Sequence, residues 1–220
     1  QTPFFLPKQI FAKMGCYGEI LIAQLLNNPD YLAASDRAVP PEFRVPNEAP
    51  RPLFIQADFG LDAALEPKLV EIQGFPSLYA YQPEQAQTYR DVYGLDPALR
   101  YEFVDDYWRL LKAAVLGGHD PENVVLMEID PEQQKTLADF NLMSKYCGIQ
   151  TVSVTEVKKR GNRLYHGNTP IYRIYNRVIV DELQRKGIRP GFDWREDVDV
   201  EWAGHPNWYF RISKFSLPYL

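Results

Sequence analysis

Two short segments carry carboxylate and amide side chains at a spacing that suits metal chemistry. The runs LFIQADF at 53–59 and KLVEIQGF at 68–75 alternate polar with apolar residues around a turn-prone LDAALEP, which predicts a β-hairpin. Side chains two apart on a strand share a face, so Glu71 and Gln73 point the same way and the partner strand can place Asp58 opposite them. Such oxygen donors suit Mg²⁺ and leave coordination positions for phosphate oxygens and water.

The same pattern has two other interpretations. Polar alternation is what any half-buried strand shows, so the residues can simply be the solvated face of the hairpin. An Asp followed on the next strand by Glu-x-Gln is also similar to the skeleton of the P-D-(D/E)-x-K metal-dependent nucleases, with Gln73 in the lysine position. The formal net charge of −5 opposes the nuclease, because such an enzyme needs a surface that binds phosphate.

The amino-acid composition is typical of a folded globular protein. It has 220 residues, 45% hydrophobic and 24% charged, which fits one large domain or two small ones and excludes collagen and coiled coils. The net charge argues against nucleic acid as a partner. Since no apolar run approaches the roughly 20 residues of a membrane helix, we expect no membrane association and a cytoplasmic protein. Cys16 and Cys147 are too few for a disulfide framework, and the oligomeric state is not indicated.

The first half of the chain is predicted to hold two long helices around the hairpin. Apolar residues recur every three or four positions over 8–27, which predicts an amphipathic helix that ends at Asn28-Pro29. Prolines crowd residues 40–52, which we interpret as a rigid connector. A second helix is predicted from one apolar stripe, ended by Gly117-Gly118; the stripe consists of Leu99, Phe103, Tyr107, Leu110, Leu111 and Ala114.

The second half has the pattern of an α/β protein. The apolar run 123–129 predicts a strand buried on both faces, and 149–154 predicts the next strand. Between them Asp130 is a candidate helix N-cap, followed by Pro131, and Gly148 follows the last turn. This is a βαβ unit with parallel strands. Further strands are predicted in RLYH, PIYRIYN and NWYFRIS, and a helix in RVIVDELQRK.

The expected fold class is therefore α/β, or α+β, with a mixed sheet that contains the βαβ unit. We expect two parts, residues 1–118 with the N-terminal helix and the hairpin, and residues 119–220 as an α/β domain, which could also form one compact unit.

The hairpin sequence resembles a known enzyme family. PLFIQADFGLDAALEPKLVEIQGFPSLY is similar to the segment of circularly permuted ATP-grasp ligases, such as glutathionylspermidine synthetase, in which an R-x-D-F strand precedes K-L-[LV]-E-x-N and a P-[ST] turn. The resemblance implies that Asp58, Glu71 and Gln73 are magnesium ligands and that Ser77 lies in the substrate-binding turn. Gln56 stands where the family has an arginine that supports phosphate, and Gln73 replaces the usual asparagine.

The resemblance continues to the C-terminus. Residues 123–183 look like the family's α/β substrate domain, and HPNWYFRISKFSLPYL is similar to a stretch that leads toward its nucleotide-clamping part. This implies that Arg173 and Arg177 bind a substrate carboxylate and that Lys214 contacts the nucleotide. The residues alone leave alternatives open: Arg177 can pair with Asp181 one helical turn later, and Lys214 can be an ordinary surface lysine.

By resemblance the expected function is a carboxylate–amine ligase that uses Mg²⁺ and ATP, acts through an acyl phosphate, and joins a small-molecule acid to a small-molecule amine. The family's nucleotide-clamping part lies downstream of the final Leu-Pro, so we expect either a fragment of a longer ligase or a truncated relative. Because Gln56 and Gln73 depart from the family pattern, a ligand-binding domain without catalysis is a further alternative.

Overall fold

The computed structural model describes residues 3–95 and 106–220, which form two compact units. Unit 1 comprises the described residues of Gln1–Pro76 together with His205–Leu220, and unit 2 the described residues of Ser77–Gly204. This division differs from the expected boundary after residue 118 in two ways: the described residues of 77–118 belong to unit 2, and the chain returns to unit 1 for its last segment. That return depends on packing between residues far apart in the chain, which local composition does not record.

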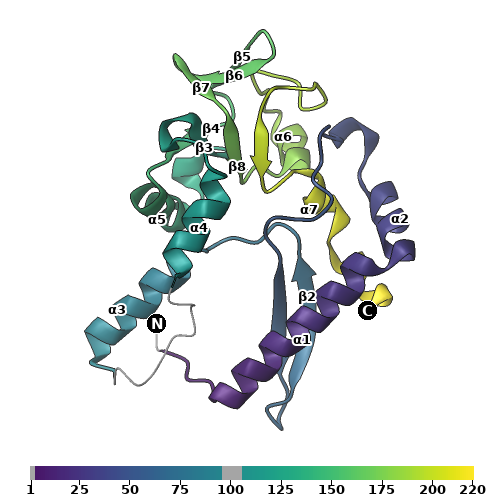
Figure 1. Ribbon diagram of the computed structural model, residues 1–220, viewed down its shortest axis with the longest axis vertical. Helices are drawn as coiled ribbons and strands as arrows, with labels where there is room; N and C mark the ends of the chain where they lie inside the picture. Colours follow the sequence, from purple (N-terminus) through teal and green to yellow (C-terminus); the bar gives the residue numbers. More distant parts are fainter. Residues whose placement is uncertain (1–2, 96–105) are drawn as a thin grey trace. The chain divides into compact units, whose positions relative to one another are not determined.

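Unit 1 is a β-hairpin packed against helices (Figure 1). Its elements, in chain order, are α1 (Lys8–Asn27), α2 (Pro29–Ala38), the 3₁₀ turn η1 (Pro41–Phe43), β1 (Gln56–Leu61), β2 (Pro67–Gln73), α7 (Asn207–Arg211) and the 3₁₀ segment η4 (Lys214–Tyr219). The helix predicted over 8–27 and the hairpin are both confirmed. Asn28 ends α1 and its side chain accepts the backbone N–H groups of Asp30 and Tyr31, so it also caps α2.

The core of unit 1 lies on one face of the hairpin. Ile72 of β2 packs there with Leu25 of α1 and with Trp208 and Ile212 of the C-terminal segment. Gly74 follows β2, and a Cβ atom at this position would lie 2.6 Å from the backbone oxygen of Trp208. A glycine is therefore required for the close approach of β2 to α7.

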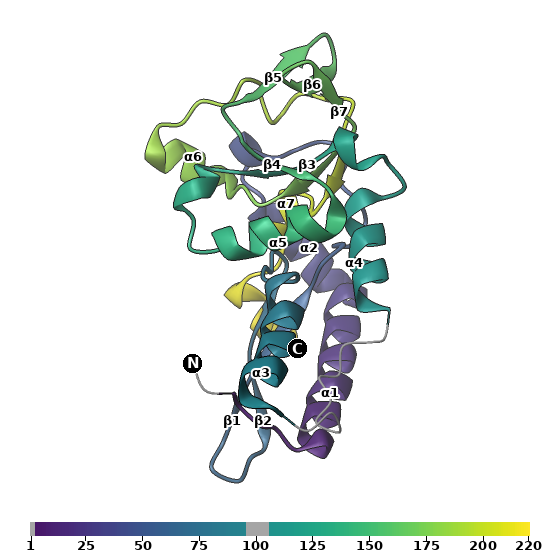
Figure 2. The same ribbon diagram turned by 90° about the vertical axis from the view of Figure 1, so that its left-hand side faces the viewer.

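Unit 2 contains a parallel sheet and a small antiparallel sheet (Figure 2). Its elements are α3 (Tyr81–Tyr93), α4 (Tyr107–Leu116), η2 (Pro121–Asn123), β3 (Val124–Glu128), η3 (Pro131–Gln133), α5 (Leu137–Cys147), β4 (Gln150–Ser153), β5 (Val157–Arg160), β6 (Arg163–His166), β7 (Thr169–Ile171), β8 (Arg173–Asn176), α6 (Val180–Lys186) and β9 (Glu201–Ala203).

The parallel sheet has the strand order β4-β3-β8-β9, with every neighbouring pair parallel. Every residue of β3 is buried, as the apolar run of its first four residues predicts and with Glu128 at its end buried as well, and β3-α5-β4 is the expected βαβ unit. Strands β5, β6 and β7 form a separate antiparallel sheet. The α/β fold class is thus confirmed. The expected mixed sheet is wrong, because the sheet that contains the βαβ unit is entirely parallel and the antiparallel strands form separate sheets.

Three local expectations need correction. NWYFRIS forms helix α7 and not a strand, because Trp208 and Ile212, four residues apart, both face the core. Asp130 does not cap the helix of the βαβ unit: it has a left-handed φ of 43° before a 3₁₀ turn, and α5 begins only at Leu137. The sequence expectations also missed α2, α3, β5 and β9, and the single strand expected in PIYRIYN is divided between β7 and β8, which lie in different sheets.

Helix α4 matches the later part of the second predicted helix, including its end at Gly117. Leu99 and Phe103, which were assigned to the same helix, lie outside the described residues. Among the described residues, no helix combines the length and apolar character needed to cross a membrane.

Candidate functional site

The register of the hairpin places four polar residues on one face. Gln56 pairs with Gln73 and Asp58 with Glu71, and paired residues of antiparallel strands project to the same side. Ile72 and its partner Ala57 project to the other side, into the core of unit 1. We call Gln56, Asp58, Glu71 and Gln73 the hairpin cluster.

A β-bulge explains how this face is built. Asp58 pairs with Glu71 and the next residue, Phe59, pairs with Leu69, so Val70 is an extra residue on β2. Leu69 packs on the core, whereas Val70 is 54% exposed, and a Cβ at Gly60 would lie 3.6 Å from its Cγ2, on the face of the hairpin away from that core. The adjacent apolar residues Leu69 and Val70 therefore belong to different faces, which accounts for the break in alternation in KLVEIQ.

Hydrogen bonds join the side chains of the hairpin cluster. Gln73 Nε2 donates to Asp58 Oδ2 and, over 3.3 Å, to Glu71 Oε1. Gln56 Nε2 donates to Asp58 Oδ1 over 2.7 Å. The structure thus brings together Asp58, Glu71 and Gln73, the residues expected to bind magnesium.

The hairpin cluster has two carboxylates and no cation of its own. Within residues 3–95 and 106–220, no lysine or arginine forms an ion pair with Asp58 or Glu71. A half-turn of the Gln73 amide would exchange its nitrogen for its oxygen and complete a set of three oxygen donors. This donor set fits a hard divalent cation. No group of three or more His, Cys, Asp or Glu side chains placed to hold a metal occurs among the described residues, so the amide is essential to this site.

The other predicted residues lie elsewhere. Ser77 is half-buried at the start of unit 2. Lys214 is exposed at the start of η4, which packs through Phe215 and Tyr219 on the core around Ile72. No hydrogen bond or ion pair links Lys214 to the hairpin cluster within the described part of the chain.

Arg173 has the contacts of a structural residue. Its guanidinium donates to the backbone oxygens of Ala114 and Val115 over 3.0 Å, at the C-terminal end of α4, and forms a 2.6 Å ion pair with Glu201. A cation at this end of a helix is favoured by the helix dipole. A Cβ at Gly117 would also lie 2.6 Å from Arg173 Cζ, so the glycine makes room for this contact. We therefore do not include Arg173 in a substrate site.

Arg177 follows β8 at the carboxyl edge of the parallel sheet. Its backbone N–H donates to Met127 O over 2.9 Å, which holds it next to the end of β3. There Glu128 is only 8% exposed, and burial raises its pKa to about 7, partly opposed by the N–H of Ile129 and by the positive charge of Arg177. Arg177 therefore lies where ligands commonly bind in parallel α/β sheets.

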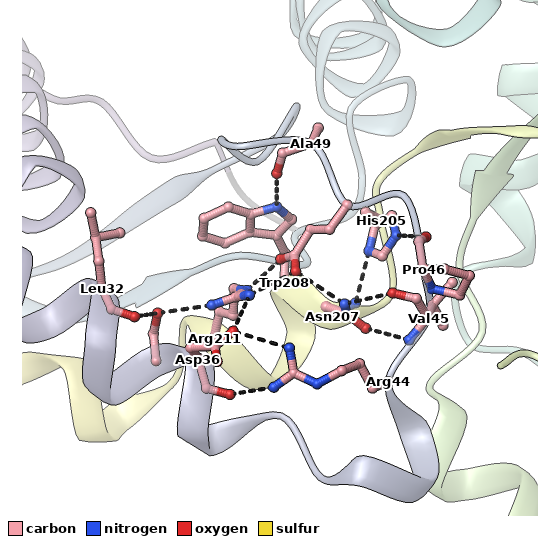
Figure 3. Close-up of polar contacts among 12 residues, drawn as sticks. Leu32, Asp36, Arg44, Val45, Pro46, Ala49, His205, Asn207, Trp208 and Arg211 are labelled. Atoms are coloured by element: carbon pink, nitrogen blue, oxygen red, sulfur yellow. Dashed lines mark hydrogen bonds and ion pairs between the residues drawn. The ribbon is translucent and has the colours of Figure 1, made fainter. Parts of the chain in front are cut away.

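A second polar cluster in unit 1 holds the proline-rich segment against α7 (Figure 3). We call Asp36, Glu48, Asn207 and Arg211 the arginine clamp. Arg211 donates from Nε and Nη2 to both Glu48 oxygens and from Nη2 to Asp36 over 2.8 Å. Asn207 exchanges two 3.0 Å hydrogen bonds with the backbone of Val45. Every member is bonded within the protein, so the clamp is structural.

His205 extends the clamp. Its Nε2 donates to Pro46 O over 3.0 Å, and its Nδ1 accepts the backbone N–H of Asn207. Burial lowers the pKa of His205, which favours the neutral form of its ring. Sequence reasoning missed the clamp because its partners are about 160 residues apart, and no local pattern joins them.

Asp139 is a buried carboxylate with a structural role that the sequence analysis did not identify. It is fully buried in unit 2 and accepts the backbone N–H groups of Leu78, Ala80 and Tyr81. These bonds fix the start of α3 and the left-handed backbone of Leu78, whose φ is 71°. Burial nevertheless raises the pKa of Asp139. In the sequence, Asp139 is one polar residue in the mostly apolar segment that forms α5, and no local pattern indicated which groups it would bind.

Comparison with known proteins adds no assignment. No protein-family model matches the chain, and no curated protein is similar enough to be identified as a relative.

Proposed function

We propose that this chain belongs to a Mg²⁺- and ATP-dependent carboxylate–amine ligase and that Asp58, Glu71 and Gln73 hold its metal. The observation that carries the proposal is the hairpin cluster: two carboxylates directly opposite each other, joined by amides, with no ion-pairing cation among the described residues. The resemblance of the hairpin sequence to circularly permuted ATP-grasp ligases gives the reaction class.

The repulsion between the two carboxylates of the hairpin cluster is a reason to propose a metal there. Like charges directly opposite on neighbouring strands destabilise a sheet, and amide donors offset only part of that repulsion. A divalent cation would offset it fully, and carboxylates with an amide oxygen are donors that Mg²⁺ accepts. When bound, Mg²⁺ would neutralise phosphate charge and so favour phosphoryl transfer.

The protein's own side chains have distinct parts in this proposal. Asp58 and Glu71 supply negative charge, and Gln56 orients Asp58 through its 2.7 Å hydrogen bond. Because Gln56 is neutral where the family has an arginine, it adds no positive charge for phosphate. In unit 2, Arg177 is the residue suited to bind a carboxylate, since a guanidinium binds both carboxylate oxygens at once.

The test is calorimetric titration of the full chain with Mg²⁺ alone and with Mg²⁺ and ATP. We expect binding by the natural chain and loss of at least about ten-fold in affinity in Glu71→Gln, which keeps the size of the side chain. Glu19→Gln is the matched control, because Glu19 is exposed on α1, the helix that packs against the other face of the hairpin. Unchanged binding in Glu71→Gln would contradict the metal site.

Two outcomes would change the function assigned. Mg²⁺-dependent nicking of DNA without ATP would replace the ligase with the nuclease alternative. Mg²⁺ binding without any binding of ATP would leave a metal-binding domain without ligase chemistry.

A further inference from the structure

The antiparallel sheet β5-β6-β7, which Figure 2 shows at the top of the view, carries several basic residues. Val157, Leu164 and Ile171 are fully buried on its inner face. Because side chains alternate along a strand, Lys158, Arg160 and Arg163 project from the outer face. We call these three residues the basic face. None of the three strands contains Asp or Glu, although the chain as a whole has a net charge of −5.

Two arginines of the basic face stand directly opposite each other. Arg160 pairs with Arg163 across the β5–β6 hairpin, and Lys158 lies two residues before Arg160 on the same strand. Like charges in such positions destabilise a hairpin. The like charges of Arg160 and Arg163 destabilise the β5–β6 hairpin, so their presence indicates a role other than folding.

Only part of this charge is neutralised within the chain. Arg163 forms an ion pair with Asp199, and Lys159, on the inner side, pairs with Glu196 over 2.7 Å. No carboxylate in the described part of the chain pairs with Lys158 or Arg160. These two cations are therefore available to an external anion.

Both side chains are nevertheless held in place. The guanidinium of Arg160 lies 4.7 Å from the ring centroid of Tyr165 and donates to Gly167 O over 2.8 Å. Lys158 Nζ donates to Thr155 O over 2.8 Å. Cations already fixed by the protein lose less conformational entropy when they bind a partner.

We propose that the basic face binds an extended acidic segment of a partner protein. Alternate residues of an extended chain lie roughly 6.6–6.8 Å apart and point the same way, so acidic residues at every second position match the spacing of Lys158 and Arg160. A short peptide fits better than a nucleic acid because the three cations of the basic face can neutralise only a few phosphates.

The experiment uses fluorescence anisotropy with a labelled short peptide of alternating threonine and glutamate, added to the full chain at low ionic strength. We expect the acidic peptide to bind and its threonine–glutamine counterpart not to bind. In Lys158→Gln/Arg160→Gln the Kd should rise about ten-fold, and added salt should weaken binding by the natural chain.

The matched control is Lys112→Gln/Lys135→Gln, which removes the same charge at exposed positions outside the basic face. It should change the Kd by less than about two-fold. Thermal unfolding of both variants checks that they fold, and the single variant Arg160→Gln repeats the test with less change to the hairpin. Equal weakening in both double variants, no binding of the acidic peptide, or tighter binding of a single-stranded oligonucleotide would each overturn the proposal.

Discussion

The hairpin cluster and the arginine clamp are both carboxylate clusters in unit 1, and they are built on opposite principles. In the clamp, Arg211 meets both oxygens of Glu48, and the two side chains are only 13% and 15% exposed. In the hairpin cluster, the hydrogen bonds of Asp58 and Glu71 within the described part of the chain come from amide side chains. The charge of Glu48 is thus met by a cation, whereas no cation among the described residues pairs with Asp58 or Glu71.

This difference separates structural acids from candidate ligands. A buried carboxylate stabilises a fold when a cation or several N–H groups compensate it, as for Glu48 and for Asp139. Two adjacent carboxylates without such partners do not benefit folding. The comparison therefore predicts opposite effects on stability when each cluster is altered.

The largest effect is expected at Arg211. Arg211→Met keeps the length of the side chain but leaves the half-buried Glu48, whose side chain is only 15% exposed, without its cation, so the free energy of unfolding should fall by about 3 kcal/mol or more. Urea denaturation measures this. Adding Glu48→Gln removes the stranded charge and should restore part of the loss; a double variant no more stable than the single one would contradict the clamp.

The second prediction concerns Glu128, a buried carboxylate whose charge is only partly compensated by neighbouring groups. Its pKa of about 7 in the folded protein exceeds the ordinary 4.5, so the folded state binds a proton that the unfolded state releases between these values. The free energy of unfolding should therefore fall as pH rises from 4.5 to 7, by on the order of 3 kcal/mol in total.

Glu128→Gln should remove this pH dependence, because its amide oxygen can still accept the N–H of Ile129. Denaturation of the natural chain and the variant at several pH values is the measurement. Arg177, Glu182 and Lys186 also act on Glu128 and remain in both proteins. Parallel pH profiles would show that the pKa of Glu128 is the same in the folded and the unfolded state and would contradict this prediction.

Two glycines of unit 1 differ in how closely other atoms pack against them, and alanine substitutions test this difference. Gly74→Ala should cost about 1–3 kcal/mol, because the new Cβ would meet the backbone of Trp208 at 2.6 Å. Gly15→Ala should instead stabilise the protein by about 0.5–1 kcal/mol, since Gly15 lies within α1 and a Cβ there meets nothing within 4 Å. Thermal unfolding compares the two, and equal effects would contradict the packing.

The smallest effect is expected in the hairpin cluster. Without divalent cations, Glu71→Gln should raise the free energy of unfolding by about 0.2–1 kcal/mol, because it removes the repulsion with Asp58. With Mg²⁺ present, the natural chain should gain stability through binding and the variant should not. A large loss of stability in Glu71→Gln without Mg²⁺ would place Glu71 with the structural carboxylates.

Local patterns in the sequence predicted much of the fold and the centre of the candidate site. Alternation over residues 53–75 was enough to place Asp58, Glu71 and Gln73 on one face, because side-chain direction in a hairpin follows from strand period alone. The buried strand β3 was predicted from its continuous apolar run, and the βαβ unit from the helix signals between two such strands.

What the sequence did not predict depends on distant contacts. Helix α7 was expected to be a strand because its aromatic residues favour strands, but the helical spacing of Trp208 and Ile212 serves a core made by α1 and β2. Arg173 looked like a ligand-binding residue, and only the position of α4 shows that it caps that helix. Asp139 binds N–H groups about 60 residues away.

Because β2 contains an extra residue, the hairpin could lose one residue without reversing the direction of its side chains. In a regular strand, losing one residue reverses the direction of every side chain beyond it. Because Val70 is already surplus to the pairing, a chain without it would restore strict alternation and leave both carboxylates facing as before. Shortening β2 at this point would thus alter the twist of the ribbon while keeping its chemical groups in place.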